Sequence, residues 1–367
     1  MAIAKLIISF FLSIGQILSP VVAFVANGGE GAFFTEWSET DTFDKDDYIE
    51  LKKTPGEDFV VLNLTDVQLN DEEIYDKEGI YTETLIRKLV EEQKPDLITL
   101  SGDNAWATMA YIELIKLIDS FGIPWAPVMG NHDGQRCISE FWAAYLLSQA
   151  ENCLFRFGPK DMGYGNYIIN VTENDHIIHT FFMFDTHAND DFVKEDGSTV
   201  SGYDHIWDNQ KAWYKWAVEG IAAMEGKTVE STAVMHIPVV EYENAWQSVK
   251  MDSEGAEFGV IDPQYSEIAS GRRREAVCSS PVNNAFFTLC KDLGSTKNIL
   301  VGHDHVNDYS VYYDGIRLTY SVKTGFGSYW DGDMIGGTTL SLNSLGNIFV
   351  ESHYVDLEAN GFDITDE

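Results

Sequence analysis

Basic residues are scarce in this sequence. The chain of 367 residues has 24 Lys and Arg against 59 Asp and Glu, and its formal net charge at pH 7 is -35. Such a surface repels nucleic acids and anionic membranes, because binding to either one needs clustered Lys and Arg. The composition therefore argues against binding to a nucleic-acid backbone and favours an acidic surface that keeps an exported protein soluble.

Long apolar runs are also missing after the N-terminus, and the chain has no internal repeat and no low-complexity tract. At the N-terminus, Lys5 precedes an apolar run over 6–18, and a small residue, Ala23, follows at a plausible cleavage site. This order is typical of a secretory signal peptide, which we predict over 1–23, with an uncleaved membrane anchor as the alternative. We therefore expect a secreted, periplasmic or cell-surface protein.

Cysteines are few, and none of them has the Cys-x-x-Cys spacing of zinc and redox sites. The four residues, Cys137, Cys153, Cys278 and Cys290, form two local pairs along the sequence. In an exported chain, the bridges 137–153 and 278–290 are the simplest connectivity. Four free thiols are the alternative.

Hydrophobic residues make up 44% of the chain, which is enough for a large core. We predict an exposed acidic lead-in over 24–56, a single domain over 57–357 and a short acidic tail over 358–367. The stretch 240–281 is polar and poorly patterned, and we expect it to form a surface excursion near the site.

Within the predicted domain, apolar strands repeatedly end in polar residues. The strands predicted first are 59–64, 97–100, 125–129, 232–235 and 298–301, and the residues that follow them include Asp66, Asp103, Asn131, His236 and His303. Helical spacing over 84–93 and 111–121 separates the first three strands. This alternation indicates an α/β fold with largely parallel strands, in which ligands bind beyond the carboxyl ends of the strands.

The second half of the chain has more β character. Further strands are predicted over 167–171, 177–184, 309–313, 316–321 and 346–354, and further helices over 209–224 and 282–293.

The polar residues at the strand ends suit the cleavage of phosphate esters by two metal ions, which needs a bridging carboxylate with oxygen and nitrogen ligands. Asp103 suits the bridge, and Asn131 offers a carbonyl oxygen. The spacing of His303 and His305 directs two imidazoles into one loop. Mixed nitrogen and oxygen ligation favours Mn, Fe or Zn over Mg or Ca.

Five segments in order resemble the motifs of the calcineurin-like metallophosphoesterases. They are Thr65-Asp66-Val67-Gln68, Gly102-Asp103-Asn104, Gly130-Asn131-His132-Asp133, Met235-His236 and Gly302-His303-Asp304-His305. The longer string from Gly302 to Tyr309 is similar to the purple-acid-phosphatase-like branch. The resemblance covers about residues 57–330. It implies two mixed β-sheets packed face to face and flanked by helices, with the metal site at the carboxyl ends of the strands.

The resemblance also implies a role for each motif residue. One transition-metal ion would be held by Asp66, Asp103 and His305, and a second by Asp103, Asn131, His236 and His303. His132 would protonate the leaving oxygen or stabilise its charge, oriented by an acidic residue such as Asp133 or Asp66. A hydroxide bridging the two metals would attack phosphorus in line. The substrate would be a small phosphate monoester or diester.

Two positions depart from the family pattern. The family places histidine at the position of Gln68, whose amide oxygen is a weaker ligand than imidazole, so direct ligation by Gln68 stays open. The tyrosine that colours true purple acid phosphatases would stand at Trp106, so we expect a colourless protein. Gln68 also supports the alternative function, a non-catalytic exported binding protein with a degenerate first metal site.

Two further motifs have simpler readings. Asp185-Thr186-His187 repeats the D-x-H pattern but comes after the Gly-Asp motif, so we expect a loop at the rim of the site. Arg272, Arg273 and Arg274 form the one basic run, which is predicted to be a solvated turn or, alternatively, a lip that attracts phosphate.

Overall fold

The computed structural model describes residues 29–71, 74–136, 138–193, 197–251 and 259–364. The predicted signal peptide and Cys137 lie outside these ranges. Within them, no helix is both long enough and apolar enough to cross a membrane.

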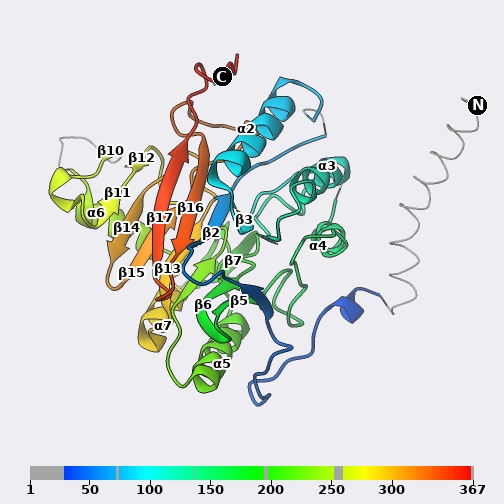
Figure 1. Ribbon diagram of the computed structural model, residues 1–367, viewed down its shortest axis with the longest axis vertical. Helices are drawn as coiled ribbons and strands as arrows, with labels where there is room; N and C mark the ends of the chain where they lie inside the picture. Colours follow the sequence, from blue (N-terminus) through cyan, green and yellow to red (C-terminus); the bar gives the residue numbers. More distant parts are fainter. Residues whose placement is uncertain (1–28, 72–73, 137, 194–196, 252–258, 365–367) are drawn as a thin grey trace, which may run out of the picture.

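Two mixed β-sheets form the centre of the molecule, with helices on their outer faces (Figure 1). The smaller sheet has five strands, in the order β17 (Ile348–Tyr354), β16 (Gly336–Leu342), β2 (Phe59–Leu64), β3 (Leu97–Ser101) and β4 (Trp125–Val128). Strands β2, β3 and β4 are parallel, and β16 runs antiparallel to β2. The carboxyl ends of the three parallel strands therefore meet at one edge of this sheet.

The larger sheet has eight strands. Their order is β1 (Ile49–Lys52), β5 (Tyr167–Glu173), β6 (His176–Met183), β9 (Ser231–Val234), β13 (Thr296–Val301), β15 (Ile316–Tyr320), β14 (Ser310–Tyr313) and β11 (Ala269–Ser270). Strands β6, β9, β13 and β15 are parallel to one another. The expected sandwich of mixed sheets is confirmed.

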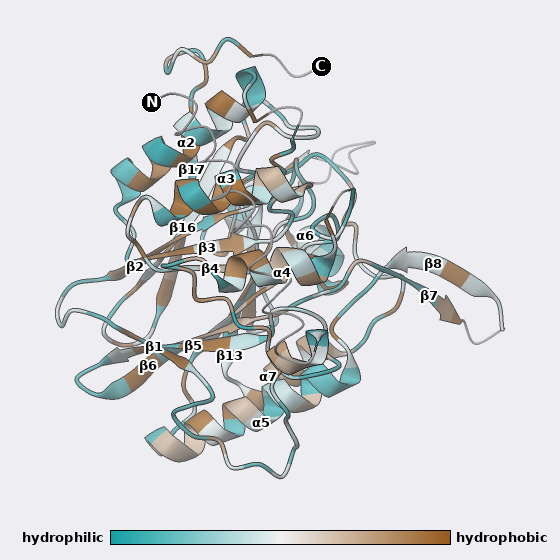
Figure 2. Cartoon of the chain, turned by 90° about the vertical axis from the view of Figure 1, so that its right-hand side faces the viewer, coloured by the Kyte–Doolittle hydropathy of each residue, from teal (hydrophilic) through white to brown (hydrophobic). Residues whose placement is uncertain are grey.

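Short pairs of strands lie outside the two sheets. Strands β7 (Asn189–Val193) and β8 (Thr199–Tyr203) form a hairpin that projects from the body of the molecule (Figure 2). Strands β10 (Gly259–Val260) and β12 (Arg272–Arg273) pair within the predicted excursion.

Three helices cover each outer face. Helices α2 (Lys77–Gln93), α3 (Thr108–Asp119) and α4 (Glu140–Ser148) pack on the five-stranded sheet. Helices α5 (Asp208–Glu225), α6 (Glu241–Val249) and α7 (Phe286–Leu293) pack on the eight-stranded sheet. Two short 3-10 helices, Glu30–Phe33 and Pro263–Tyr265, lie in connecting segments.

The apolar periodicity of the sequence explains the packing of α2. Leu85, Ile86 and Leu89 share one face of this helix and are buried against the sheet. The helix ends where Lys94 adopts a left-handed conformation, before Pro95, which cannot continue a helix.

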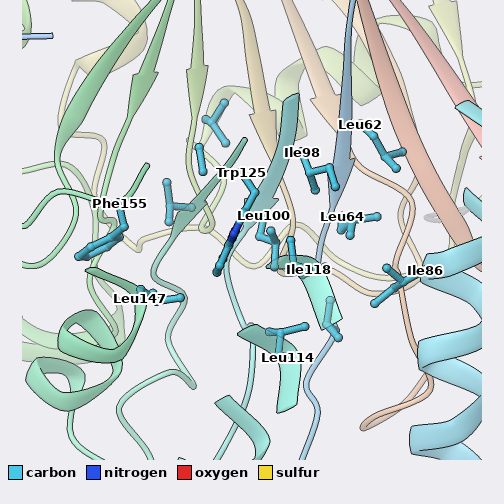
Figure 3. Close-up of a cluster of buried hydrophobic side chains, with 14 of the residues drawn as sticks. Leu62, Leu64, Ile86, Ile98, Leu100, Leu114, Ile118, Trp125, Leu147 and Phe155 are labelled. Carbon is cyan, nitrogen blue, oxygen red and sulfur yellow. The ribbon is translucent and has the colours of Figure 1, made fainter. Parts of the chain in front are cut away.

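Figure 3 shows the apolar cluster that fixes the strands of the five-stranded sheet. Leu64 of β2 and Leu100 of β3 lie there with Ile86 of α2 and with Leu114 and Ile118 of α3. All five side chains are at most 1% exposed, and burying an aliphatic side chain of this size contributes about 1.5–3 kcal/mol. The cluster therefore anchors the strands whose ends carry the candidate ligands.

Three expectations about the architecture are corrected. The lead-in 24–56 is not entirely exposed, because β1 joins the eight-stranded sheet beside β5 and Lys53 forms a buried ion pair with Glu173 at 3.0 Å. The stretch 240–281 is more regular than expected, because α6 buries Tyr242 and Trp246. Strand β16 was not predicted, since its Gly- and Thr-rich sequence lacks an apolar alternation.

The predicted bridge 278–290 is wrong, because Cys278 and Cys290 are both free thiols. Cys290 is buried on α7, whereas Cys278 lies in a loop where its backbone N–H donates to Asp304. Cys153 is free as well.

Candidate metal centre

The loops that follow five parallel strands meet at one edge of the sandwich. They come from β2, β3, β4, β9 and β13, and they carry Asp66, Asp103, Asn131, His236, His303 and His305. All six side chains are buried. One ligand atom from each of Asp66, Asp103 and His236 lies within 4.8 Å of the others. The fold therefore brings together residues that lie far apart in the sequence.

Left-handed backbone turns aim these side chains. Asp66, Gln68, Asp103 and His303 have φ angles of 51°, 47°, 51° and 79°. Residues other than glycine adopt this region rarely, and each such turn costs on the order of 1–3 kcal/mol. The loops are locked together by backbone hydrogen bonds from Asp66 N to Gly102 O at 3.1 Å and from Gln68 N to Asp103 O at 2.9 Å.

His236 lies at the centre of the nitrogen-rich half of the cluster. Its Nε2 is 3.0 Å from Asn131 Oδ1, 3.3 Å from Asp103 Oδ1 and 3.2 Å from His303 Nδ1. Its Nδ1 lies 2.8 Å from the carbonyl oxygen of Ser101. Because a carbonyl only accepts, Nδ1 carries a proton. Burial opposes protonation of the other nitrogen, but mainly the charge of Asp103 raises the pKa of His236 to about 10 in the metal-free protein. A metal ion at Nε2 would therefore displace the proton there, while Ser101 O keeps Nδ1–H in place.

Asp66 and His305 form the other half of the cluster. Asp66 Oδ2 accepts hydrogen bonds from His303 N at 2.9 Å and Thr65 Oγ1 at 2.8 Å. His305 Nδ1 lies 2.8 Å from the carbonyl oxygen of Tyr329, and its Nε2 lies 3.5 Å from Asp66 Oδ1. Both residues thus keep one potential ligand atom directed towards the cluster.

Two buried atoms of the cluster, Asp66 Oδ1 and His303 Nε2, have no hydrogen-bond partner among the described residues. Buried polar atoms are almost always paired, so atoms left unpaired at such a site are available to a ligand. Carboxylate, amide and imidazole donors together suit a transition-metal ion. The residues present therefore fit a bound metal ion at this cluster.

Gln68 does not present its oxygen to the cluster. Its Nε2 donates to Asp103 Oδ2 at 3.0 Å, and its Oε1 lies 3.5 Å from Lys323 Nζ. A carboxylate only accepts and an ammonium only donates, so this network fixes the orientation of the amide. The amide nitrogen is the atom that faces Asp103.

Lys323 is a site residue that the sequence motifs do not include. Its side chain is buried, and its Nζ donates to the backbone oxygen of Asp66 at 2.6 Å. It follows the carboxyl end of β15, which is parallel to β13. Lys323 could have been found from the sequence because it follows a predicted strand, as His303 does, and both strands belong to the eight-stranded sheet.

The charges of the cluster favour ionised carboxylates in the metal-free protein. Burial raises the pKa of Asp66, but the contact with His305 at 3.5 Å and the charges of His236, His305 and Lys323 outweigh it and hold this pKa well below its usual range. Burial likewise opposes ionisation of Asp103, yet mainly His236 lowers its pKa to about 2. Two carboxylates are thus ready to bind a cation.

His132 lies at the open side of the centre. Its Nδ1 is 2.8 Å from Gln135 Oε1, and its ring packs edge-on against Trp106 with centroids 5.5 Å apart. The partner that orients this ring is therefore Gln135, and the expectation of Asp133 or Asp66 in that role is corrected.

Asp133 points into the interior of its loop instead. It accepts hydrogen bonds from the backbone N–H groups of Gly130 at 2.7 Å and Asn104 at 2.8 Å, and from the hydroxyl of Tyr111. These contacts tie the loop after β4 to the loop after β3. Asp133 thus supports the loop that carries Asn131 and His132.

The D-x-H repeat lies in a separate hydrogen-bonded cluster. The His187 ring stacks on Trp207 with centroids 3.7 Å apart, and its Nε2 lies 3.1 Å from Gln210 Oε1. The other ring nitrogen, Nδ1, lies 3.7 Å from Asp185 Oδ2. Both nitrogens of this histidine thus have neighbours within its own cluster, apart from the candidate ligands.

The three arginines of the basic run are paired with acids. Arg272 contacts Asp308 at 2.9 Å and Asp333 at 2.8 Å, and Arg274 contacts Asp333 at 2.5 Å. Arg273 is buried and pairs with Glu243 at 2.8 Å. The run is therefore neither a solvated turn nor a lip of unpaired charge.

The model of the calcineurin-like phosphoesterase family matches residues 59–307. "Probable inactive purple acid phosphatase 14" of Arabidopsis thaliana is 28% identical over 273 residues, which cover 68% of this chain and 63% of that protein. "Phosphatase DCR2" of Saccharomyces cerevisiae is 26% identical over 289 residues, which cover 72% of this chain and 47% of that protein. The chain thus spans less than two thirds of the length of these curated relatives.

Among solved structures, a dimetal phosphatase from Danio rerio aligns with a TM-score of 0.46 and 11% identity, over 78% of this chain and 94% of that one.

Proposed function

The chain belongs to the calcineurin-like phosphoesterase family, and from this premise we propose that it hydrolyses phosphate esters at the metal centre described above. The observation that carries the proposal is the convergence of Asp103, Asn131 and His236, with 3.0 and 3.3 Å between His236 Nε2 and the two oxygens. Small phosphorylated molecules are the proposed substrates, and the same centre serves monoesters and diesters.

Bound transition-metal ions such as Mn, Fe or Zn would supply Lewis-acid activation and positive charge for the phosphoryl oxygens. The residues that would hold one ion are Asp103, Asn131, His236 and His303. Asp66 and His305 offer further ligand atoms beside it. Ser101 and Tyr329 accept hydrogen bonds from His236 and His305 and thereby hold these rings in place.

His132 is the proposed general acid. Its Nδ1–H is held by Gln135 Oε1, and its Nε2 lies 4.0 Å from Asp103 Oδ2 at the open side of the centre. The side chain is 35% exposed, so a substrate can reach Nε2. A protonated ring there would hand its proton to the leaving oxygen and would be stabilised by the neighbouring carboxylate.

The centre attracts phosphate although the chain as a whole is acidic. The ammonium of Lys323 places positive charge inside the site, and bound metal would add to it, whereas the net charge of -35 belongs to the whole chain. At physiological salt, surface charges more than about 8 Å away are largely screened, so the local charges dominate binding.

The first test removes single ligands. We expect Asn131→Ala and His236→Ala to lower the hydrolysis of p-nitrophenyl phosphate and its bis ester by at least about 100-fold, because the loss of a group that merely supports a metal ligand already costs about 10–100-fold. Circular dichroism should show unchanged folding.

His176→Ala is the matched control, since His176 is an exposed histidine of β6 outside the centre. It should retain normal turnover after the same loading with Mn or Zn. Near-normal turnover in Asn131→Ala or His236→Ala would contradict the assignment of the ligands.

The second candidate function is a non-catalytic exported binding protein. Gln68 and Lys323 at the Asp66 side of the cluster favour it, and relatives in Arabidopsis thaliana bear the name "probable inactive". A folded, metal-loaded protein that binds inorganic phosphate but turns over neither ester would support this alternative. Fewer than about one bound metal ion per chain after loading would exclude the enzyme.

A further inference from the structure

We propose that the chain binds a single metal ion, and that the ammonium of Lys323, with Gln68 beside it, replaces a second ion on the Asp66 side of the centre. This inference rests on the proposed function only in placing a metal ion at His236. It concerns the number of ions and the residues that set it, which the family membership leaves open.

The first argument is the position of Lys323. Its Nζ is buried and donates to the backbone oxygen of Asp66 at 2.6 Å, with Gln68 Oε1 3.5 Å away. A positive charge at this place attracts the carboxylates of Asp66 and Asp103 through space, although it forms no direct ion pair with either. A divalent ion bound on the same side would be repelled by it, twice as strongly as a monovalent ion at the same distance.

The second argument is the state of Asp103. A carboxylate that bridges two ions needs one oxygen for each of them. Here Oδ1 lies 3.3 Å from His236 Nε2, but Oδ2 accepts a hydrogen bond from Gln68 Nε2 at 3.0 Å. Oδ1 also accepts from His132 N at 2.8 Å, so each oxygen keeps a lone pair. Beside Oδ2, however, Gln68 presents an N–H donor, where a second ion would need a ligand atom.

The third argument is that the unpaired oxygen of Asp66 needs no second ion. One ligand atom each of Asp66, Asp103 and His236 lies within 4.8 Å of the others, so all three suit one cation. Asp66 Oδ1, which has no hydrogen-bond partner among the described residues, is then a ligand of the same ion that His236 binds.

The fold also holds Lys323 in place from both sides. Gly336 N donates to Lys323 O at 2.9 Å, and Thr324 N donates to Thr65 O at 2.9 Å. The segment that carries the ammonium is therefore joined to β16 and to the loop of Asp66. These backbone hydrogen bonds fix the position of Lys323, in contrast to a flexible lysine on the surface.

The test counts metal ions. The wild-type protein is loaded with Mn or Zn, freed of excess metal and measured by inductively coupled plasma mass spectrometry. We expect about one ion per chain, and about two in the double variant Gln68→His with Lys323→Met, which has an imidazole and no ammonium. Gln68→His alone is the matched control and should stay at about one, because the ammonium remains.

A wild-type count of two ions or of none would overturn the proposal, as would a folded double variant that still binds one. Electron paramagnetic resonance of the Mn-loaded wild type gives an answer even where the double variant does not fold. The spectrum of isolated Mn ions supports the proposal, and that of a coupled pair overturns it.

These outcomes separate this inference from the proposed function. One ion per chain without turnover of either ester would leave the inference standing and overturn the enzyme. Two ions per chain with turnover would overturn the inference and leave the proposed enzyme standing.

Discussion

His179 shows how burial fixes the charge of a single side chain far from the metal centre. Its Nδ1 lies 3.0 Å from Gly346 O and its Nε2 lies 3.1 Å from Thr232 Oγ1. Desolvation lowers the pKa of this ring to about 4, although the carbonyl of Gly346 opposes the shift. The ring is therefore neutral in the folded protein at pH values where a histidine of the unfolded chain takes up a proton.

The stability of the fold should depend on pH through this residue. Because the folded pKa is depressed, the contribution of His179 is fully present above the unfolded pKa of about 6.5 and is lost as the pH falls through about 4. We expect the wild type to lose about 2–3 kcal/mol more of its unfolding free energy than His179→Gln between pH 7.5 and 4.5. Urea unfolding of metal-free protein measures both.

His176→Gln is the control for this comparison, since His176 lies on the same strand but is exposed. It should keep the pH dependence of the wild type. An equal pH dependence in His179→Gln and the wild type would contradict the neutral state of His179.

At the scale of residues, the motifs predicted the ligand cluster but not its partners. Asp66, Asp103, Asn131 and His236 follow strands, so strand ends and motif order were enough to bring them together. Lys323 lies 257 residues from Asp66 in the sequence, and no local pattern links the two. Gln135 was missed because a glutamine three residues after a histidine is not a recognisable motif.

The turn after β3 decides how this element presents its ligands. Gly102 has a φ angle of +94°, and a Cβ atom at this position would lie 2.6 Å from Nδ1 of His236. That nitrogen is the one that donates to Ser101 O. The glycine therefore serves two purposes, a left-handed turn and the close approach of the His236 ring.

Gly102→Ala should lower the affinity for metal, whereas its effect on the stability of the fold should be modest. Alanine in a left-handed turn costs about 1–2 kcal/mol of stability, and the displaced His236 should lower metal affinity by about 10–100-fold. Competition with a chelating dye measures the affinity.

Gly122→Ala gives the matched control. Its φ angle is +66°, and a Cβ atom there would meet nothing within 4 Å. This variant should lose only the stability that the left-handed turn itself costs, with unchanged metal affinity. Equal affinity in the two variants would contradict the packing argument.

At the scale of elements, the parallel strands were the most predictable part of the fold. Strands β2, β3 and β13 are apolar runs because both faces are buried, and the sequence shows this directly. Strand β1 was missed because its residues are only partly buried, in an alternating pattern of four residues. Helix α6 is only nine residues long and has Glu241 and Glu243 in its first turn, which hid its buried face.

At the scale of the whole molecule, sequence and family resemblance together predicted the two-sheet sandwich, whereas the distribution of charge required the structure. The arginines of 272–274 seemed available to phosphate, but Asp308, Asp331 and Asp333 pair with Arg272 and Arg274. These carboxylates lie 36 or more positions along the chain from their partners. With 24 basic residues against 59 acidic ones, most carboxylates have no basic partner.

Repulsion among these unpaired carboxylates should destabilise the folded chain at low salt, because folding brings like charges together. Raising NaCl from about 0.01 M to about 1 M shortens the Debye length from about 30 Å to about 3 Å and screens this repulsion. We therefore expect the melting temperature of the metal-free protein to rise, by about 1–2 °C for each kcal/mol gained in a chain of this length. Differential scanning calorimetry in EDTA measures the shift.

The opposing effect of salt is the screening of favourable ion pairs. Exposed pairs such as Lys77–Asp363 contribute little, with a median of about 0–1 kcal/mol, and the excess of acidic residues over basic ones is large. Repulsion should therefore dominate. Sucrose at matched osmolality controls for changes in water activity, and a larger rise in NaCl than in sucrose is expected. A melting temperature that falls or stays constant with NaCl would show that favourable ion pairs, and not the net charge, govern the stability of this acidic fold.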